Sequence, residues 1–237
     1  MTAEAVSAEA PIMPRPWILP QHWLNVSFLH WAVEPAWIAH LYPPDTVPDT
    51  FDGRSFVGVV PFQMSLLGSF LETNIRLYSV DSTGRRGVVF LSLDASRPDI
   101  VAATRCTVGV PYRWARMTYR ENGNRRVYTT RMRRRGISSS IEVQVGGPIP
   151  SGPLELFLTA RWGAHVARFG RTWYLPNSHP AWALRQTELI DFTDHGLLAS
   201  VGLGELSRRP PDHVAFSDGV RARFGRPVPS TTRRSAA

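Results

Sequence analysis

The chain has 237 residues, of which 43% are hydrophobic and 19% charged, so it is long and apolar enough to bury a core and is not intrinsically disordered. All 27 basic residues are arginine, and the formal net charge is +8. Without a lysine the chain cannot form a Schiff base, use a lysine general base or attach pyridoxal phosphate. The single cysteine, Cys106, likewise excludes an intrachain disulfide and a thiolate zinc cluster.

Strand patterns dominate the first half of the chain. Alternating or continuous apolar, aromatic and β-branched residues predict strands at 23–32, 55–64, 70–78 and 87–95. Pro61 lacks a backbone N–H, so its strand lies at a sheet edge or carries a bulge at that point. The last of these strands is apolar on both faces, which predicts a central position in the sheet.

The second half of the chain continues as a mostly β pattern. An Asn122-Gly123 turn predicts a hairpin, and further strands are expected at 139–145, 173–178, 183–192 and 214–224. Helical spacing predicts three short helices, at 35–41, 97–107 and 154–161. With no repeat and no linker, we expect one domain over 17–224 between disordered tails, 1–16 and a basic 225–237.

The strand at 70–78 carries the most informative pattern. Leu71, Ile75 and Leu77 fall on one face because strand side chains alternate. The opposite face reads Phe70, Glu72, Asn74, Arg76 and Tyr78. This row of acid, amide and cation between two aromatic residues favours a pocket wall, although a solvent-exposed strand with a cross-strand ion pair has the same alternation.

Ordered motifs give the chain a family resemblance. They are Phe28-Leu29-His30-Trp31, residues 50–62, Phe70-Leu71-Glu72-Thr73-Asn74-Ile75-Arg76, residues 90–94, residues 109–112 and Phe157-Leu158-Thr159. Over residues 17–220 the chain resembles the YqjF-like family of bacterial proteins, which is grouped by fold with acetoacetate decarboxylase. The resemblance implies an α+β, mostly β fold, in which a bent antiparallel sheet closes into an acetoacetate-decarboxylase-like barrel with two or three external helices. The Glu72 row would then face the central cavity.

The resemblance does not carry over the decarboxylase chemistry. That enzyme works through a lysine Schiff base, which this chain cannot form, while its needs for a carboxylate and an arginine could be met by Glu72 and Arg76. This chain also has Ala160 where the family usually has a glutamate. If that acid serves a family activity, this member has altered or lost it.

These observations predict a cofactor-free small-molecule enzyme of the lyase, isomerase or cyclase type, with no metal. Glu72 would transfer a proton and Arg76 would clamp an anionic group of a small carbonyl or carboxylate compound. We expect Asn74, His30, Tyr78 and Tyr112 to contact the substrate; for His30 a satisfied core histidine is an open alternative, and for Tyr112 a buried hydrogen-bonded tyrosine. A non-catalytic barrel that binds a hydrophobic or acidic ligand is the alternative function.

The charge and hydropathy patterns of the sequence also predict the partners and the location of the protein. The basic run Arg131–Arg135 lies beside the predicted hairpin, and no nucleic-acid-binding motif accompanies it, so we expect no nucleic-acid partner. No apolar run reaches the roughly 20 residues that span a bilayer, and residues 1–16 lack a signal-peptide pattern. We therefore expect a cytoplasmic protein that does not bind membranes, with enough apolar surface among its eight tryptophans for a homo-oligomer.

Overall fold

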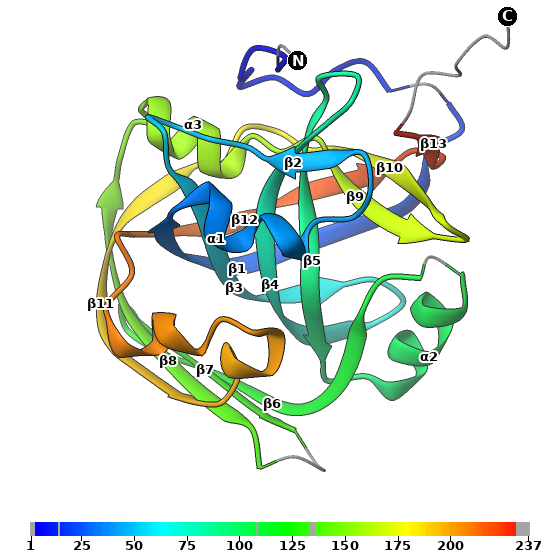
Figure 1. Cartoon of the computed structure of the whole chain (residues 1–237). Helices are drawn as coiled ribbons and strands as arrows, with labels where there is room; N and C mark the ends of the chain where they lie inside the picture. The colour runs from blue at the N-terminus through cyan, green and yellow to red at the C-terminus, as the bar shows by residue number, and fades with distance from the viewer. Residues whose placement is uncertain (1–2, 14, 108, 133–135, 231–237) are drawn as a thin grey trace, which may run out of the picture.

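The computed structural model describes residues 3–13, 15–107, 109–132 and 136–230, which build one 13-stranded sheet (Figure 1). The strands are β1 Ile18–Val33, β2 Thr46–Pro48, β3 Ser55–Ser65, β4 Ser69–Asp81, β5 Arg86–Ala95, β6 Tyr112–Asn122, β7 Arg125–Met132, β8 Ser138–Pro148, β9 Gly163–Arg168, β10 Arg171–Ser178, β11 Leu184–His195, β12 His213–Phe224 and β13 Val228–Pro229. The helices are α1 Pro35–Ile38, α2 Pro98–Thr107 and α3 Pro153–Thr159, with 3-10 segments η1 Ala39–Leu41, η2 Ala199–Val201 and η3 Gly204–Arg208.

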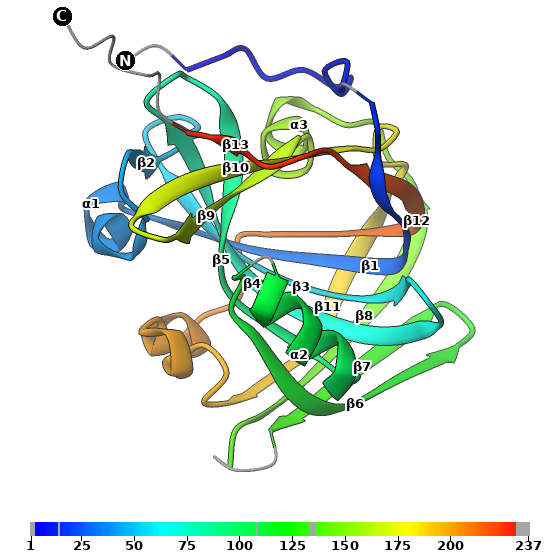
Figure 2. The same cartoon turned by 90° about the vertical axis from the view of Figure 1, so that its right-hand side faces the viewer.

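The sheet closes on itself through the pairing of β4 with β5. Strands β5, β6, β7, β8, β11, β12, β1, β3 and β4 form a ring of nine (Figure 1). Strands β9 and β10 leave this ring at β5, through Val88 opposite Ala164, and rejoin it at β12, through Asn177 opposite Phe224 (Figure 2). The strands β12, β1, β3, β4 and β5 therefore form a wall that is shared by two closed spaces.

The shared wall separates two hydrophobic cores. On the side of β9, β10 and α3, the first core includes Phe28, Phe62 and Phe157. On the side of β7, β8 and the 3-10 segments, the second core includes Ile75 and Leu77. Strand alternation delivers neighbouring residues of one strand to different cores, so a central strand of the wall is buried on both faces.

Most of the predicted elements are present within a few residues. The mostly β fold with three α-helices in the described part of the chain is confirmed. Pro61 lies in an internal strand, at the interruption of the β1–β3 ladder between Leu24 and Leu29, so the bulge alternative holds. The predicted helix at 35–41 tightens into α1 followed by η1. The short strands β2 and β13 and the 3-10 segments η2 and η3 are additions to the sequence prediction.

The two stretches that we expected to be disordered tails contact the domain where the structure describes them. The Glu4 N–H donates to the Gly84 carbonyl at 2.9 Å, and Trp162 Nε1 donates to the Ser7 carbonyl at 3.1 Å. Near the other terminus, β13 pairs with β10. The remaining residues 231–237, and 133–135 of the arginine run, lie outside the described residues.

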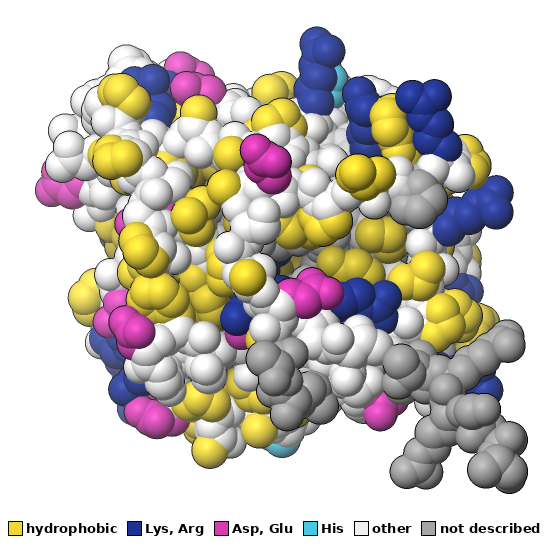
Figure 3. All heavy atoms as spheres, turned by 90° about the horizontal axis from the view of Figure 1, so that it is seen from above, with side chains coloured by type: hydrophobic (Ala, Val, Ile, Leu, Met, Phe, Trp, Pro, Cys, Tyr) yellow, Lys and Arg dark blue, Asp and Glu magenta, His cyan; other side chains and the backbone are white. Residues whose placement is uncertain are grey.

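The surface of the molecule is mixed in character. The face that Figure 3 shows from above carries both hydrophobic and polar side chains, and basic side chains gather toward one edge of it. Within the described residues, no helix combines the length and apolarity needed to span a membrane.

Candidate functional site

A cavity of about 520 Å³ is lined by side chains from β1, β3, β4, β5, β9, β10 and α2, among other segments. Its lining is mainly aromatic and aliphatic, with Trp23, Phe28, Phe62, Phe90, Trp173, Trp182 and Phe224 among its residues. Four polar side chains of this lining lie together around β4 and the start of β6: Glu72, Asn74, Arg76 and Tyr112. The lining of the cavity is thus mainly apolar, and these four polar side chains are grouped on one side of it.

The orientation predicted for β4 is confirmed by this cavity. Glu72, Asn74 and Arg76 line it, whereas Ile75 and Leu77 are fully buried in the second core. The alternative of a solvent-exposed strand is therefore wrong. Both faces of β4 are covered because the strand lies in the shared wall.

Glu72 is a buried carboxyl with an unusual acidity. The Tyr112 hydroxyl donates a hydrogen bond to its Oε2 at 2.7 Å, and its side chain is 2% exposed. Burial raises the pKa of Glu72 from 4.5 to about 7, against the lowering effect of hydrogen bonds from Tyr112 and Asn74. A carboxyl with this pKa can both take up and release a proton near neutral pH.

Asn74 provides a buried polar group with spare hydrogen-bonding capacity. It lies between Glu72 and Arg76 along β4 and is 5% exposed. Among the described residues its Oδ1 has no hydrogen-bond partner. Because a buried unpaired oxygen costs about 1–3 kcal/mol, a ligand that donates a hydrogen bond here would recover that loss.

Arg76 brings a positive charge to the cavity. Its Nε donates to the Tyr78 hydroxyl at 3.2 Å and its Nη2 to the Leu158 carbonyl at 3.2 Å. The guanidinium also lies over the ring of Phe28, 5.6 Å from its centroid. No carboxylate lies within 4 Å of it among the described residues, so its remaining N–H groups can receive an anion.

Next to Arg76, a chain of polar contacts links side chains of β4, β1, β12 and α3. The Tyr78 hydroxyl lies 2.6 Å from His30 Nε2, His30 Nδ1 lies 3.0 Å from His213 Nδ1, and His213 Nε2 lies 3.8 Å from Glu155 Oε1. Arg76 only donates, so the Tyr78 hydroxyl accepts from it, and the tautomers of His30 and His213 decide which atom donates in the other two contacts. Burial, followed by His213 and Arg76, lowers the pKa of His30 well below 6.5, so that histidine is neutral at pH 7.

Two of the predicted substrate contacts belong to this chain of contacts and not to the cavity lining. His30 and Tyr78 are not among the residues that line the cavity, and the Tyr78 hydroxyl contacts both Arg76 Nε and His30 Nε2. Glu72, Asn74, Arg76 and Tyr112, by contrast, are brought to one wall as the sequence predicts.

Other parts of the site were not predicted from the sequence. Three of these residues lie far from β4 in the sequence: His213 and the aromatic lining residues Trp23 and Trp182. The ring of Trp182 stacks on that of Trp23, with centroids 6.1 Å apart. A signal for Trp182 lies in its neighbours, because this chain has Ala181-Trp182-Ala183-Leu184 where the family it resembles usually has Pro-Trp-Pro-Leu. Ala160, at the other family departure, is buried at the end of α3 and is not part of the cavity lining.

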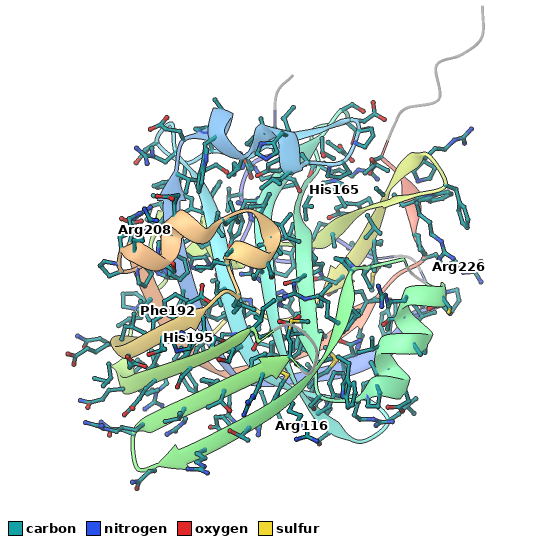
Figure 4. The ribbon with its side chains drawn as sticks, turned by 60° about the horizontal axis from the view of Figure 1, so that its bottom comes forward. Arg116, His165, Phe192, His195, Arg208 and Arg226 are labelled. Atoms are coloured by element: carbon teal, nitrogen blue, oxygen red, sulfur yellow. The ribbon has the colours of Figure 1, made fainter. Side chains whose placement is uncertain are left out.

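Charged side chains elsewhere in the interior are paired with one another. Arg161 and Arg86 both bind Asp49, and Arg113 binds Asp94. His165, labelled in Figure 4, lies inside the upper part of the molecule, with its Nδ1 2.8 Å from the Ser79 hydroxyl. The described residues contain no cluster of three or more histidine, cysteine or acidic side chains arranged to hold a metal ion.

Comparison with known protein families shows to which family the chain belongs. The model of DUF2071, a family described as an uncharacterized conserved protein, matches residues 20–221. The chain belongs to this family. It is also 26% identical over 187 residues to the protein YqjF of Bacillus subtilis, a match that covers 73% of this chain and 77% of YqjF.

Solved structures show the fold of this DUF2071 member. Acetoacetate decarboxylase from Legionella pneumophila superposes with a TM-score of 0.60 at 11% identity, covering 92% of this chain and 90% of the decarboxylase. The enduracididine biosynthesis enzyme MppR, complexed with pyruvate, superposes with a TM-score of 0.61 at 11% identity, covering 93% and 92%. The chain therefore has an acetoacetate-decarboxylase-like fold, as the sequence resemblance implies.

Proposed function

We propose that this protein is a small-molecule enzyme that binds a carbonyl or carboxylate compound in its cavity and transfers a proton through Glu72. One observation carries the proposal. A buried carboxyl with a pKa of about 7 and an arginine without a carboxylate partner among the described residues line the same wall of one sheltered space. Sites that combine a perturbed acid, a cation and an apolar enclosure favour acid–base chemistry.

The reaction would proceed by proton abstraction next to a carbonyl group. The ionised Glu72 takes the proton from the carbon, and the electron pair of that C–H bond moves onto the carbonyl oxygen as an enolate. Protonated Glu72 then returns the proton to the same or a neighbouring atom, which completes an isomerisation without an external oxidant or reductant. In a lyase reaction the electron pair of the enolate would instead expel a leaving group from the adjacent carbon, and protonated Glu72 would give its proton to that group. Arg76 binds the carboxylate of the substrate through two N–H groups, and Tyr112 holds the Glu72 carboxyl in place.

The structural neighbours support this choice of substrate class. MppR is complexed with pyruvate, a compound that combines a carbonyl and a carboxylate. Because this chain contains no lysine, a related compound would be activated here without a Schiff base.

Proton exchange in heavy water tests the proposal. Panels of 2-oxo and 3-oxo acids incubated with the protein in D₂O are expected to exchange their α-hydrogens, which proton NMR detects. Glu72→Gln is expected to lower the exchange rate at least about a hundredfold, since general acid–base groups contribute 10²–10⁴-fold. Glu188→Gln, at an exposed glutamate of β11, serves as the matched control and keeps the wild-type rate. Equal rates for Glu72→Gln and wild type would remove Glu72 from the mechanism.

A non-catalytic binding protein is the second candidate function. The predominantly apolar lining of the cavity favours it, because binding of a hydrophobic or acidic ligand needs no acid–base group. Saturable binding of such a ligand, with no exchange or turnover across the panel, would decide for this candidate.

A further inference from the structure

We infer that the ligand of this cavity is an amphiphilic monocarboxylate, with its carboxylate at Arg76 and an extended apolar body that reaches the cavity mouth. The inference rests on the proposed function, because it names the substrate class of the same site. It differs from a three-carbon acid such as pyruvate in demanding a long uncharged body.

The size of the cavity is the first argument. At about 520 Å³ it falls within the range of roughly 300–1,000 Å³ that holds drug-sized ligands. A three-carbon acid bound at Arg76 would leave most of this apolar space unfilled. Apolar surface that stays in contact with water or void contributes nothing to binding, whereas each buried methylene contributes about 0.8 kcal/mol.

The lining gives the direction of the apolar body. Next to Arg76 lies Phe28, whose ring packs edge-on against Trp182 at 5.1 Å between centroids. At the mouth, two of the lining residues are exposed hydrophobic side chains: Leu19 is 45% and Phe169 is 83% exposed. An apolar path thus extends from the guanidinium to the surface.

The charges of the site set the head group. Arg86, Arg113 and Arg161 each bind an aspartate, but Arg76 has no such partner among the described residues. A half-buried cation without a counter-ion is costly, and one carboxylate offsets that cost. Arg168, the other arginine of the lining, donates to the Cys106 carbonyl and stacks on Phe169 at the mouth. The cavity therefore favours a ligand with one anionic group, which binds Arg76, and with an uncharged remainder.

Binding of matched probes tests the head and the body separately. Isothermal titration with butanoate, decanoate and decanol, below their aggregation concentrations, is the measurement. Each methylene that enters the cavity tightens binding up to about fourfold, so decanoate is expected to bind at least a hundredfold more tightly than butanoate. Arg76→Met is expected to weaken decanoate at least tenfold and to leave decanol unchanged.

The mouth offers a matched pair of variants. Phe169 and Leu67 are both 83% exposed and both stand in hairpin turns, with φ of 53° and 50°, directly before a glycine. Phe169 lines the cavity and Leu67 does not. Phe169→Ser is expected to weaken decanoate several-fold without affecting butanoate, and Leu67→Ser to change neither.

The outcomes separate this inference from the proposed function. Proton exchange on pyruvate-sized acids without any dependence of affinity on chain length would overturn the inference and leave the proposed function standing. Tight decanoate binding that Arg76→Met weakens, together with no exchange on any acid, would support the inference and overturn the proposed function. Decanoate affinity that is identical in wild type and Arg76→Met would also overturn the inference.

Discussion

Two acidic side chains of the shared wall show how the surroundings of a residue decide its chemistry. Glu72 and Asp94 are both buried, and burial raises the pKa of each. Asp94 is bound by the guanidinium of Arg113, which opposes that rise, whereas Glu72 has only the uncharged donors Tyr112 and Asn74. Asp94 is thereby a structural ion-pair partner, and Glu72 is left as a titrating group beside the cavity.

The raised pKa of Glu72 predicts a pH dependence of stability. Folded Glu72 keeps its proton up to about pH 7 and unfolded Glu72 loses it near 4.5, so between these values the folded state binds more protons. The free energy of unfolding therefore falls by up to about 3 kcal/mol as pH rises through this window. Urea denaturation from pH 4 to 8 checks this: the difference between wild type and Glu72→Gln should change with pH, and pH-independent differences would refute it.

Removing the donor of Glu72 should move its titration. Tyr112→Phe deletes the hydrogen bond that lowers the pKa of Glu72, so that pKa is expected to rise above 7. Carbon-13 NMR of the labelled glutamate carboxyl gives the titration directly. Tyr119→Phe, which deletes a hydroxyl bonded to the remote Glu121 on the same strand, is the control and should leave the Glu72 titration unchanged. An unmoved Glu72 titration in Tyr112→Phe would contradict the assignment.

At the scale of elements, the alternating sequence of β4 places its side chains on two sides of the sheet, one at the cavity and one in the second core. Its even-numbered side chains from 72 to 76 line the cavity, and Ile75 and Leu77 pack into the second core. The strand is placed between β3 and β5, with Arg76 opposite Gly58 on β3. A Cβ at Gly58 would lie 3.2 Å from both Arg76 and His30, so the glycine leaves room for the chain of contacts next to the guanidinium.

The two faces of β4 should differ in how much they contribute to stability. Ile75→Ala removes packed volume from a filled core and is expected to cost about 2–5 kcal/mol. Asn74→Ala removes an oxygen without a partner among the described residues together with the hydrogen bond that Asn74 donates to Glu72, so it should cost about 1 kcal/mol, less than Ile75→Ala. Urea denaturation of the two variants measures this, and equal losses would contradict the two-core arrangement.

At the scale of the whole molecule, the nine-strand ring depends on a short parallel junction. Strands β5 and β6 pair over only three residues, Leu93–Ala95. Arg113 at the start of β6 reinforces this junction by binding Asp94 with two nitrogens, and its Nη1 donates to the Ser200 hydroxyl of η2 at 2.7 Å. One side chain thus joins β5, β6 and the 3-10 segment that covers the second core.

Loss of this junction should be far more costly than loss of a surface ion pair. Arg113→Met leaves the fully buried Asp94 without its cation and is expected to cost about 3–5 kcal/mol. Arg125→Met removes the half-exposed pair with Glu142 and should cost less than about 1 kcal/mol. Thermal and urea denaturation provide the comparison, and similar losses would show that the junction does not depend on Arg113.

The sequence by itself determined the local features. The alternation at 70–78, the Asn122-Gly123 hairpin and the helix at 97–107 depend on neighbouring residues, and their periods survive in any fold that uses them. The absence of lysine excludes a Schiff base on a side chain whatever the fold, because no other side chain supplies a primary amine. Only the tertiary structure decided that both faces of β4 are buried and that His30 and Tyr78 lie outside the cavity lining. These facts depend on contacts such as His30 with His213, 183 positions apart, and the spacing of residues along a chain carries no information about which distant strands will meet.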